Sequence, residues 1–233
     1  GWGSGVKGSG DHPLSEPEID ALVRAITARP NICGYNAFHT AGGVLLRPSS
    51  TAADSTLPPN DVYVWNQLAE RGTELTGYLG HSVYEDFTWD QNDTMSGAAD
   101  DWAYQHVGVY GWTTEFWDIV HAATGNHIST KAWYVGATDA ESLAVLRWLD
   151  EQPGDAHDAG FVDWYRFDHP QLGAVELGGW NDLRSWVNPP PHLLLDEVTG
   201  HADFAVHQAL AAPCIEIKHT DAGAVGDDTW RVS

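Results

Sequence analysis

Two residues of this sequence, His39 and Glu115, have the side-chain types and the settings from which a hydrolytic site can be built. Glu115 lies in the second part of the stretch Ser96–Asp118, whose β-branched and aromatic residues predict a buried strand. A lone buried carboxylate either pairs with a cation or takes part in chemistry, because burying an unpaired charge is costly. His39 ends a predicted strand and precedes the small-residue turn Thr40–Gly43, which places it to line a cleft. An isolated histidine of this kind can be a metal ligand, a general base or, most often, a structural residue.

The two side chains together suggest a zinc hydrolase. Such a site uses imidazole or carboxylate ligands, leaves one position open for water, and keeps a carboxylate nearby to take the proton of that water. His39 supplies one ligand and Glu115 the base, and the sequence contains no HExxH, HxxE or HxxEH pattern to complete the set. His81 and Glu85 lie in a stretch predicted to be extended, where their side chains would be about 13 Å apart, so we do not expect a ligand pair there. The sequence contains neither a GxSxG nucleophile elbow nor a Walker-type loop, so no other mechanism is indicated by these motifs.

The charge balance restricts the partners. The chain has 33 Asp plus Glu against 11 Lys plus Arg, a net charge of -22, which disfavours nucleic acid and anionic membrane surfaces. A dense acidic surface with few lysines is expected of a protein that works in high salt, where self-repulsion is screened. There is no run of 18 apolar residues, so we expect no membrane span. Met95 is the only methionine and no signal peptide is visible, so we expect a processed product or a fragment.

The elements that must position His39 and Glu115 alternate between helical and strand patterns. This alternation predicts an α/β fold with a mixed β-sheet flanked by helices, in which strands carry the two residues. Capping-box patterns at Ser15/Glu18 and Thr138/Glu141 predict two helix starts. Cys33 and Cys214 have no CxxC spacing and are expected to be buried small apolar residues. The other expected helices cover about 60–75 and 191–211, and the expected strands 32–38, 82–87, 173–178, 214–218 and 229–232, with a short helix before the strand of Glu115.

Several short motifs follow one another in a recognisable order: Ser15-Glu16-Pro17-Glu18, the strand into His39, Leu45-Leu46-Arg47-Pro48, Asp101-Trp102-Ala103-Tyr104 and Thr113-Thr114-Glu115. In this order and spacing the chain resembles the zinc carboxypeptidases of the pancreatic carboxypeptidase A/B type. The resemblance covers about residues 1–212. Later motifs, Asp168 to Gly173, Glu176 to Trp180 and Asn188-Pro189-Pro190, are similar to a microbial branch of the family, in which a β domain tends to follow.

The resemblance implies a site residue by residue. His39 matches the third zinc ligand of the family, and Glu115 matches the carboxylate that activates the zinc-bound water and passes its proton to the leaving amine. Asp100 matches the base of the specificity pocket, where an acid resembles the carboxypeptidase B pattern and favours a C-terminal Lys or Arg. The implied cofactor is zinc, and the implied partner is a peptide.

The sequence also departs from the family pattern. The HxxE ligands and the groups that hold the substrate's C-terminal carboxylate would precede Gly1, so we expect this chain alone to bind zinc weakly and to be inactive. The mobile-loop tyrosine of the family aligns near Asp93, and Tyr78 or Tyr84 are the alternatives. Ala41 replaces an aromatic residue beside the zinc histidine.

Three functional hypotheses follow from this resemblance. The leading one is a metallocarboxypeptidase that cleaves the C-terminal peptide bond of a peptide. The alternatives are a hydrolase of peptidoglycan stem peptides and a non-catalytic binding module of the same fold, because a fold does not decide the substrate. We expect residues 1–212 to form a partial catalytic domain and residues 213–233 the start of a C-terminal β domain. Exported relatives favour an extracellular location, and the oligomeric state is not indicated.

Overall fold

A four-stranded mixed sheet forms the centre of the fold. The computed structural model describes residues 10–92, 94–128, 136–154, 160–213 and 218–232. The sheet order is β1-β4-β2-β3, with β1 at Gly34–Thr40, β4 at Tyr110–Phe116, β2 at Val44–Arg47 and β3 at Leu79–Ser82. β1 runs parallel to β4, while β2 runs antiparallel to β4 and parallel to β3. The predicted α/β class with a mixed sheet is therefore confirmed.

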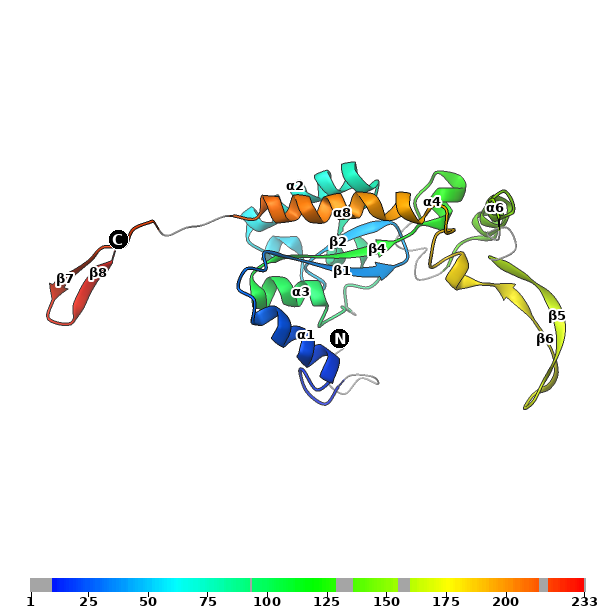
Figure 1. Cartoon of the computed structure of the whole chain (residues 1–233), viewed down its shortest axis with the longest axis horizontal. Helices are drawn as coiled ribbons and strands as arrows, with labels where there is room; N and C mark the ends of the chain where they lie inside the picture. The colour runs from blue at the N-terminus through cyan, green and yellow to red at the C-terminus, as the bar shows by residue number, and fades with distance from the viewer. Residues whose placement is uncertain (1–9, 93, 129–135, 155–159, 214–217, 233) are drawn as a thin grey trace.

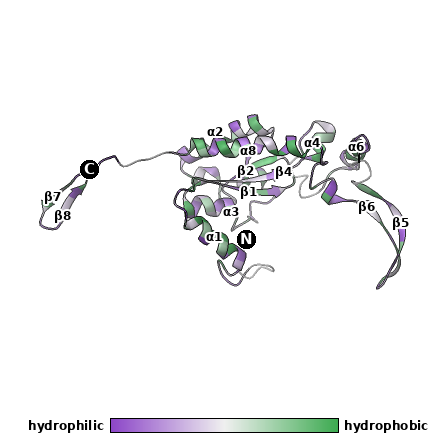
Figure 2. Ribbon diagram, viewed as in Figure 1, coloured by the Kyte–Doolittle hydropathy of each residue, from purple (hydrophilic) through white to green (hydrophobic). Residues whose placement is uncertain are grey.

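Helices cover both faces of this sheet (Figure 1). α2 (Pro59–Thr76) and α8 (Leu194–Ala211) lie on one face, and α1 (Pro17–Thr27) and the short α3 (Ala99–Trp102) lie on the other. Figure 2 shows hydrophilic and hydrophobic residues alternating along α2 and α8, as expected for helices with one buried side.

The main core lies between the sheet and the α2/α8 layer. The ring of Trp112 on β4 packs edge-on against Phe204 of α8, with centroids 5.5 Å apart. Two glycines let the helices approach closely: a Cβ at Gly72 would lie 2.6 Å from Leu45 Cδ1, and one at Gly200 would lie 2.2 Å from the carbonyl oxygen of Leu75. Alternate residues of β4 therefore belong to this core, while the intervening ones point to the α3 side.

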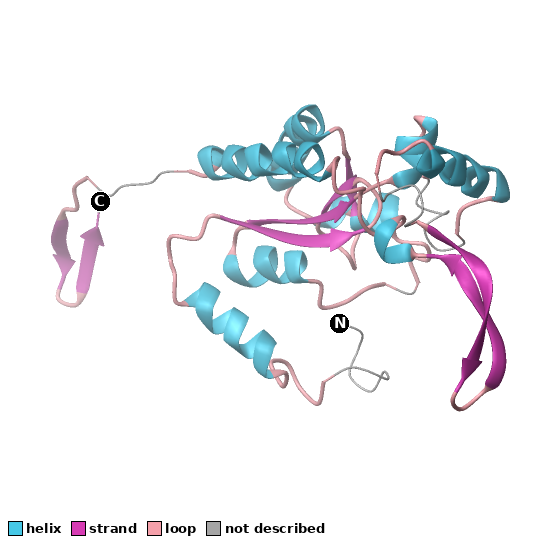
Figure 3. Cartoon of the chain, turned by 45° about the vertical axis from the view of Figure 1, so that its right-hand side comes forward, coloured by secondary structure: helices cyan, strands magenta, loops and turns pink. Residues whose placement is uncertain are grey.

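A second group of elements follows the sheet in the chain. α4 (Ile119–Thr124) and α6 (Asp139–Asp150) pack together around the buried Val145 and Leu149. The ribbon β5 (Phe161–His169)–β6 (Gly173–Trp180) projects from this group (Figure 3). The hairpin β7 (Ala222–Gly226)–β8 (Thr229–Val232) is exposed along its whole length. Short helical turns occur at Asp54–Thr56, Val83–Phe87, Ala103–Val107 and Asp182–Arg184, and no described helix meets the length and hydropathy required to cross a membrane.

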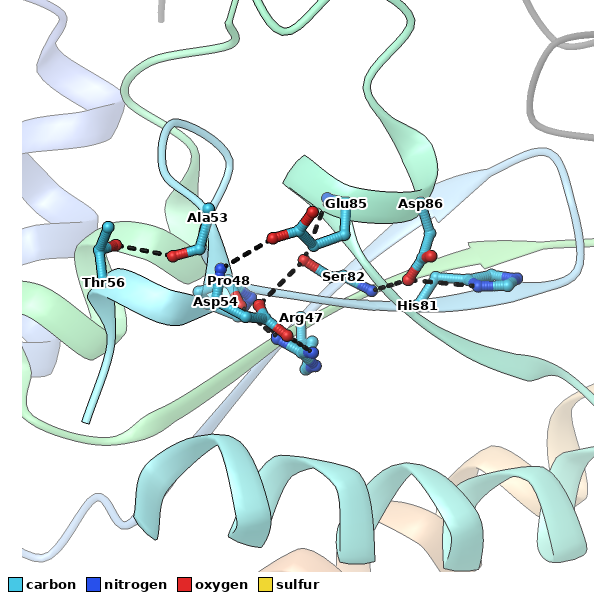
Figure 4. Close-up of polar contacts among 9 residues, drawn as sticks. All are labelled: Arg47, Pro48, Ala53, Asp54, Thr56, His81, Ser82, Glu85 and Asp86. Atoms are coloured by element: carbon cyan, nitrogen blue, oxygen red, sulfur yellow. Dashed lines mark hydrogen bonds and ion pairs between the residues drawn. The ribbon is translucent and has the colours of Figure 1, made fainter. Parts of the chain in front are cut away.

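Arg47 organises a polar cluster at the end of β2 (Figure 4). Its buried guanidinium forms an ion pair with Asp54, and this contact, with hydrogen bonds, lowers the pKa of the Asp54 carboxyl. The Asp54 amide donates to Glu85 Oε1 at 3.0 Å, and the Ser82 amide donates to Asp86 Oδ2 at 2.9 Å. The cluster thus ties β2 and β3 to the turn at Val83–Phe87.

Several local predictions were wrong. Of the expected strand 82–87, only Ser82 lies in a strand, as the end of β3, and Val83–Phe87 form a π-helical turn in which Glu85 and Asp86 bond the backbone amides of Asp54 and Ser82. Ser15 does not cap α1, because its hydroxyl donates to Glu16 and the helix begins at Pro17. β5 occupies a stretch expected to be a loop, and β7 an expected turn.

Of four other local predictions, one is confirmed, one is wrong and two remain predictions. The capping box of Thr138 and Glu141 is present at the start of α6, as predicted. Cys33 is exposed and free, contrary to the expectation of a buried residue, because it lies just before β1 begins. Cys214 and most of the expected strand 214–218 lie outside the described residues. The proposed division at residues 212 and 213 stays a prediction.

Candidate functional site

The parallel pairing of β1 and β4 brings His39 and Glu115 together. They are register partners, so their side chains project from the same face of the sheet. His39 Nδ1 lies 3.9 Å from Glu115 Oε1. The imidazole is 56% exposed and the carboxylate is 14% exposed. Residues 76 positions apart in the chain therefore form one polar pair, with the histidine on the solvent side.

The carboxyl of Glu115 is tuned by its surroundings. Burial raises its pKa from 4.5 to about 7, because a low-dielectric environment disfavours the charged form. A carboxyl with a pKa close to neutrality can both accept and return a proton near pH 7, as a general base must. This environment comes from the position of Glu115 near the end of a central strand, with Thr114 buried beside it.

Asp100 belongs to α3, on the same side of the sheet as Glu115. Its side chain is fully buried, and burial and the neighbouring Asp101 raise its pKa to about 6, against hydrogen bonds from backbone amides and Thr113. Its Oδ2 has no hydrogen-bond partner among the described residues. Asp101 turns the other way and accepts the Ser50 amide at 3.1 and 3.0 Å. Asp100 is thus the member of the acidic pair with a free acceptor atom.

Two cavities lie near these residues. One, of about 190 Å³, is lined by Ala41 and Gly42 after β1 and by Trp117 after β4. The other, of about 440 Å³, lies between α1 and α3 and is lined by Ala99 and Asp101. His39, Asp100 and Glu115 line neither of these two cavities, so the structure does not bring Asp100 together with the His39–Glu115 pair in either one.

The turn after β4 contains functional candidates that the sequence did not reveal. Trp117 has a left-handed backbone (φ 67°), and its amide donates to Tyr78 Oη at 2.8 Å. Thr40 Oγ1, next to His39, donates to the carbonyl oxygen of Phe116 at 3.1 Å. These contacts join segments far apart in the sequence, so no local sequence motif predicts them.

The remaining candidates are placed elsewhere. Tyr78 is a core residue whose hydroxyl also donates to Glu197, so it is held in place and does not serve as a mobile-loop residue. The Tyr84 amide is bound to the carbonyl of Ser49 at 3.0 Å. Glu85 Oε1 accepts the Asp54 amide at 3.0 Å. Asp93 lies outside the described residues.

The described residues do not form a complete metal site. Among them, no group of three or more His, Cys, Asp or Glu side chains is arranged to hold a metal ion. A catalytic zinc takes three protein ligands, and the pair supplies one imidazole beside one carboxylate. The pair fits one part of a zinc site and does not fit the whole.

Comparison with known proteins gives the family. The model of the family described as zinc carboxypeptidase matches residues 6–132, which is more than half of the chain and includes His39, Asp100 and Glu115. Among solved structures, the crystal structure of thrombin activatable fibrinolysis inhibitor (TAFI) is similar, with a TM-score of 0.38 and 19% identity over 60% of this chain and 34% of that chain. The chain thus spans about a third of the length of that structure. The comparison with curated proteins gives no match. The chain belongs to the zinc carboxypeptidase family.

Proposed function

We propose that the full-length protein containing this chain is a zinc metallocarboxypeptidase, with Glu115 as general base and His39 as one zinc ligand. The observation that carries the proposal is the pairing of His39 and Glu115 at the ends of adjacent parallel strands, 3.9 Å apart. Family membership supports the reaction class, the hydrolysis of a C-terminal peptide bond. The remaining zinc ligands would come from outside the described residues.

The chemistry of this pair follows from its environment. Bound zinc would polarise the scissile carbonyl and lower the pKa of a water molecule. Glu115, whose pKa is about 7, accepts a proton from the attacking water and returns it to the leaving amine. His39 is largely exposed, so its imidazole can reach a ligand position without leaving β1.

The test of this function is a glutamate-to-glutamine substitution in the full-length protein. Glu115→Gln keeps the size and removes the base, so we expect peptide hydrolysis to fall by about 10²- to 10⁴-fold with zinc content unchanged. His39→Ala should instead lower the zinc content. Glu70→Gln, an exposed site on α2, is the matched control. Full activity of the Glu115 variant would refute the role of Glu115, whereas absence of hydrolysis by the parent protein would leave the binding-module hypothesis in place.

We also propose that Asp100 sets a preference for C-terminal Lys or Arg. Its buried carboxyl has a free acceptor atom that a cationic side chain would satisfy. Asp100→Asn keeps the shape, so we expect it to lower kcat/KM for Lys and Arg peptides and to spare Leu and Phe peptides. A panel that adds muropeptides separates the peptidase from the peptidoglycan hydrolase. Equal losses for all peptides would contradict the specificity role.

A further inference from the structure

The segment that follows Glu115 is held in an unusual conformation. β4 ends at Phe116, and Trp117 adopts a left-handed backbone conformation that residues other than glycine seldom take. Trp117 is 4% exposed, so its polar backbone atoms need partners inside the protein. A conformation of this kind persists only where the surroundings over-determine it.

Three contacts fix Trp117 from three directions. Its amide donates to Tyr78 Oη at 2.8 Å, its carbonyl oxygen accepts the Gly42 amide at 2.7 Å, and its indole Nε1 donates to the carbonyl oxygen of Ser185 at 2.6 Å. Only in the first of these contacts is the partner of Trp117 a side chain of another residue. Substitution at Tyr78 therefore addresses the backbone of Trp117 directly.

Tyr78 is itself oriented for this contact. It lies between the C-terminal end of α2 and the start of β3, and it is 7% exposed. Its hydroxyl donates to the carboxylate of Glu197 on α8, which turns the oxygen lone pairs toward the Trp117 amide. Burial and the negative charge of Glu197 raise the pKa of the Tyr78 hydroxyl, so it stays protonated as this arrangement requires.

The same turn also reaches the strand of His39. Gly42 belongs to the turn that follows β1, and it bonds the carbonyl oxygen of Trp117. Thr40 Oγ1 bonds the carbonyl oxygens of Phe116 and, at 2.6 Å, Val187. A displacement of Trp117 would therefore move both Phe116, which follows Glu115, and Thr40, which follows His39.

We propose that Tyr78, oriented by Glu197, is a positioning residue that holds Glu115 in register with His39 through the backbone of Trp117. The inference rests on the proposed function of Glu115. The hydroxyl contacts neither a reacting atom nor the His39–Glu115 pair, and it acts through the two-residue connection from Glu115 to Trp117. Its role is to fix the position of the base.

The matched pair of variants is Tyr78→Phe and Tyr110→Phe in the full-length protein. Tyr110 begins the strand that carries Glu115, and its hydroxyl also donates to a carboxylate, Asp61 Oδ1, at 3.1 Å. Both substitutions remove one phenol-to-carboxylate hydrogen bond from the core. For Tyr78→Phe we expect a fall in kcat of about 10- to 100-fold with KM changed by less than about threefold, because a small misplacement of a catalytic group has effects of this size. For Tyr110→Phe we expect kcat within about twofold of the parent protein, because Tyr110 lies at the other end of β4 from Glu115 and points to the opposite face of the strand.

A double variant separates positioning from stability. Tyr78→Phe/Glu197→Leu removes the carboxylate that would lose its donor, so the melting temperature should recover. A positioning role requires kcat to stay low with KM nearly unchanged, because the Trp117 amide still lacks Tyr78 Oη. Recovery of kcat together with the melting temperature would overturn the inference and leave a purely structural contact.

Two further readouts complete the test. In this 233-residue chain, hydrogen exchange of the Trp117 amide should accelerate in Tyr78→Phe and not in Tyr110→Phe, and equal exchange in both would overturn the inference. Glu115→Gln belongs in the same kinetic series. If that variant keeps its activity, the proposed function fails first and the positioning role falls with it. If it is inactive while Tyr78→Phe equals Tyr110→Phe, the positioning role alone is refuted.

Discussion

Replacing Glu115 by glutamine should stabilise this chain at alkaline pH and leave its stability almost unchanged at acidic pH. The folded protein raises the pKa of this carboxyl from 4.5 to about 7 through burial. The folded state therefore holds the proton more tightly than the unfolded state, and the free energy of unfolding falls as the pH rises through this interval. Glutamine does not titrate, so the variant avoids that loss.

The size of the effect follows from the two pKa values. One pKa unit corresponds to about 1.4 kcal/mol, so the rise from 4.5 to about 7 corresponds to ~3 kcal/mol above the folded pKa. The side chain is 14% exposed, and residual solvation reduces the charge penalty, so we expect ~2–3 kcal/mol.

Urea unfolding of the wild-type chain and Glu115→Gln at about pH 5 and about pH 8 measures this difference directly. A chelator must be present, because a cation beside the carboxylate would stabilise its charged form. Glu70→Gln removes an exposed carboxyl from α2 and reports the effect of net charge alone. If Glu115→Gln shifts the free energy of unfolding equally at both pH values, burial does not tune this carboxyl and the reasoning is refuted.

Four further predictions concern other parts of the chain. Asp100→Asn should stabilise the chain above about pH 6 by ~1–3 kcal/mol and not at acidic pH, since burial raises the pKa of Asp100 too. Urea unfolding at two pH values checks this prediction, and an equal change in the free energy of unfolding at both would refute it. Arg47→Leu should lower the free energy of unfolding by ~3 kcal/mol near neutral pH, and this loss should shrink as the pH falls through the lowered pKa of Asp54. Arg71→Leu removes an exposed ion pair and should lower it by under ~1 kcal/mol. Equal losses for the two variants would contradict this prediction. Thr138→Ala should cost ~1 kcal/mol through loss of the capping box, measured by thermal unfolding, and no change would refute the cap. With a net charge of -22, the melting temperature should fall when molar salt is removed, and an unchanged melting curve would exclude adaptation to high salt.

Part of the structure could be predicted because its signals are local. Helices were predicted over about 60–75 and 191–211, where α2 and α8 lie, and the pattern of Thr138 and Glu141 predicted the start of α6. Other local signals were outweighed by contacts from distant segments. The stretch 82–87 has a strand-like composition, yet Glu85 and Asp86 bond backbone amides of Asp54 and Ser82 and hold Val83–Phe87 in a helical turn. β5 has no clean alternation, because most of its side chains are exposed and neither of its faces is buried against a core.

Side-chain types in short windows were enough to predict that Glu115 lies in a buried strand and that His39 lies at the end of another. The sequence by itself also determined the family, through the order of several motifs. Only the tertiary structure decided that the two strands are adjacent and parallel, which sets the 3.9 Å separation of the pair. The structure likewise decided that Tyr78 bonds Trp117 and that Asp100 keeps a free acceptor atom. These facts depend on which distant segments pack together, and burial by those segments is also what raises the pKa of Glu115 to about 7.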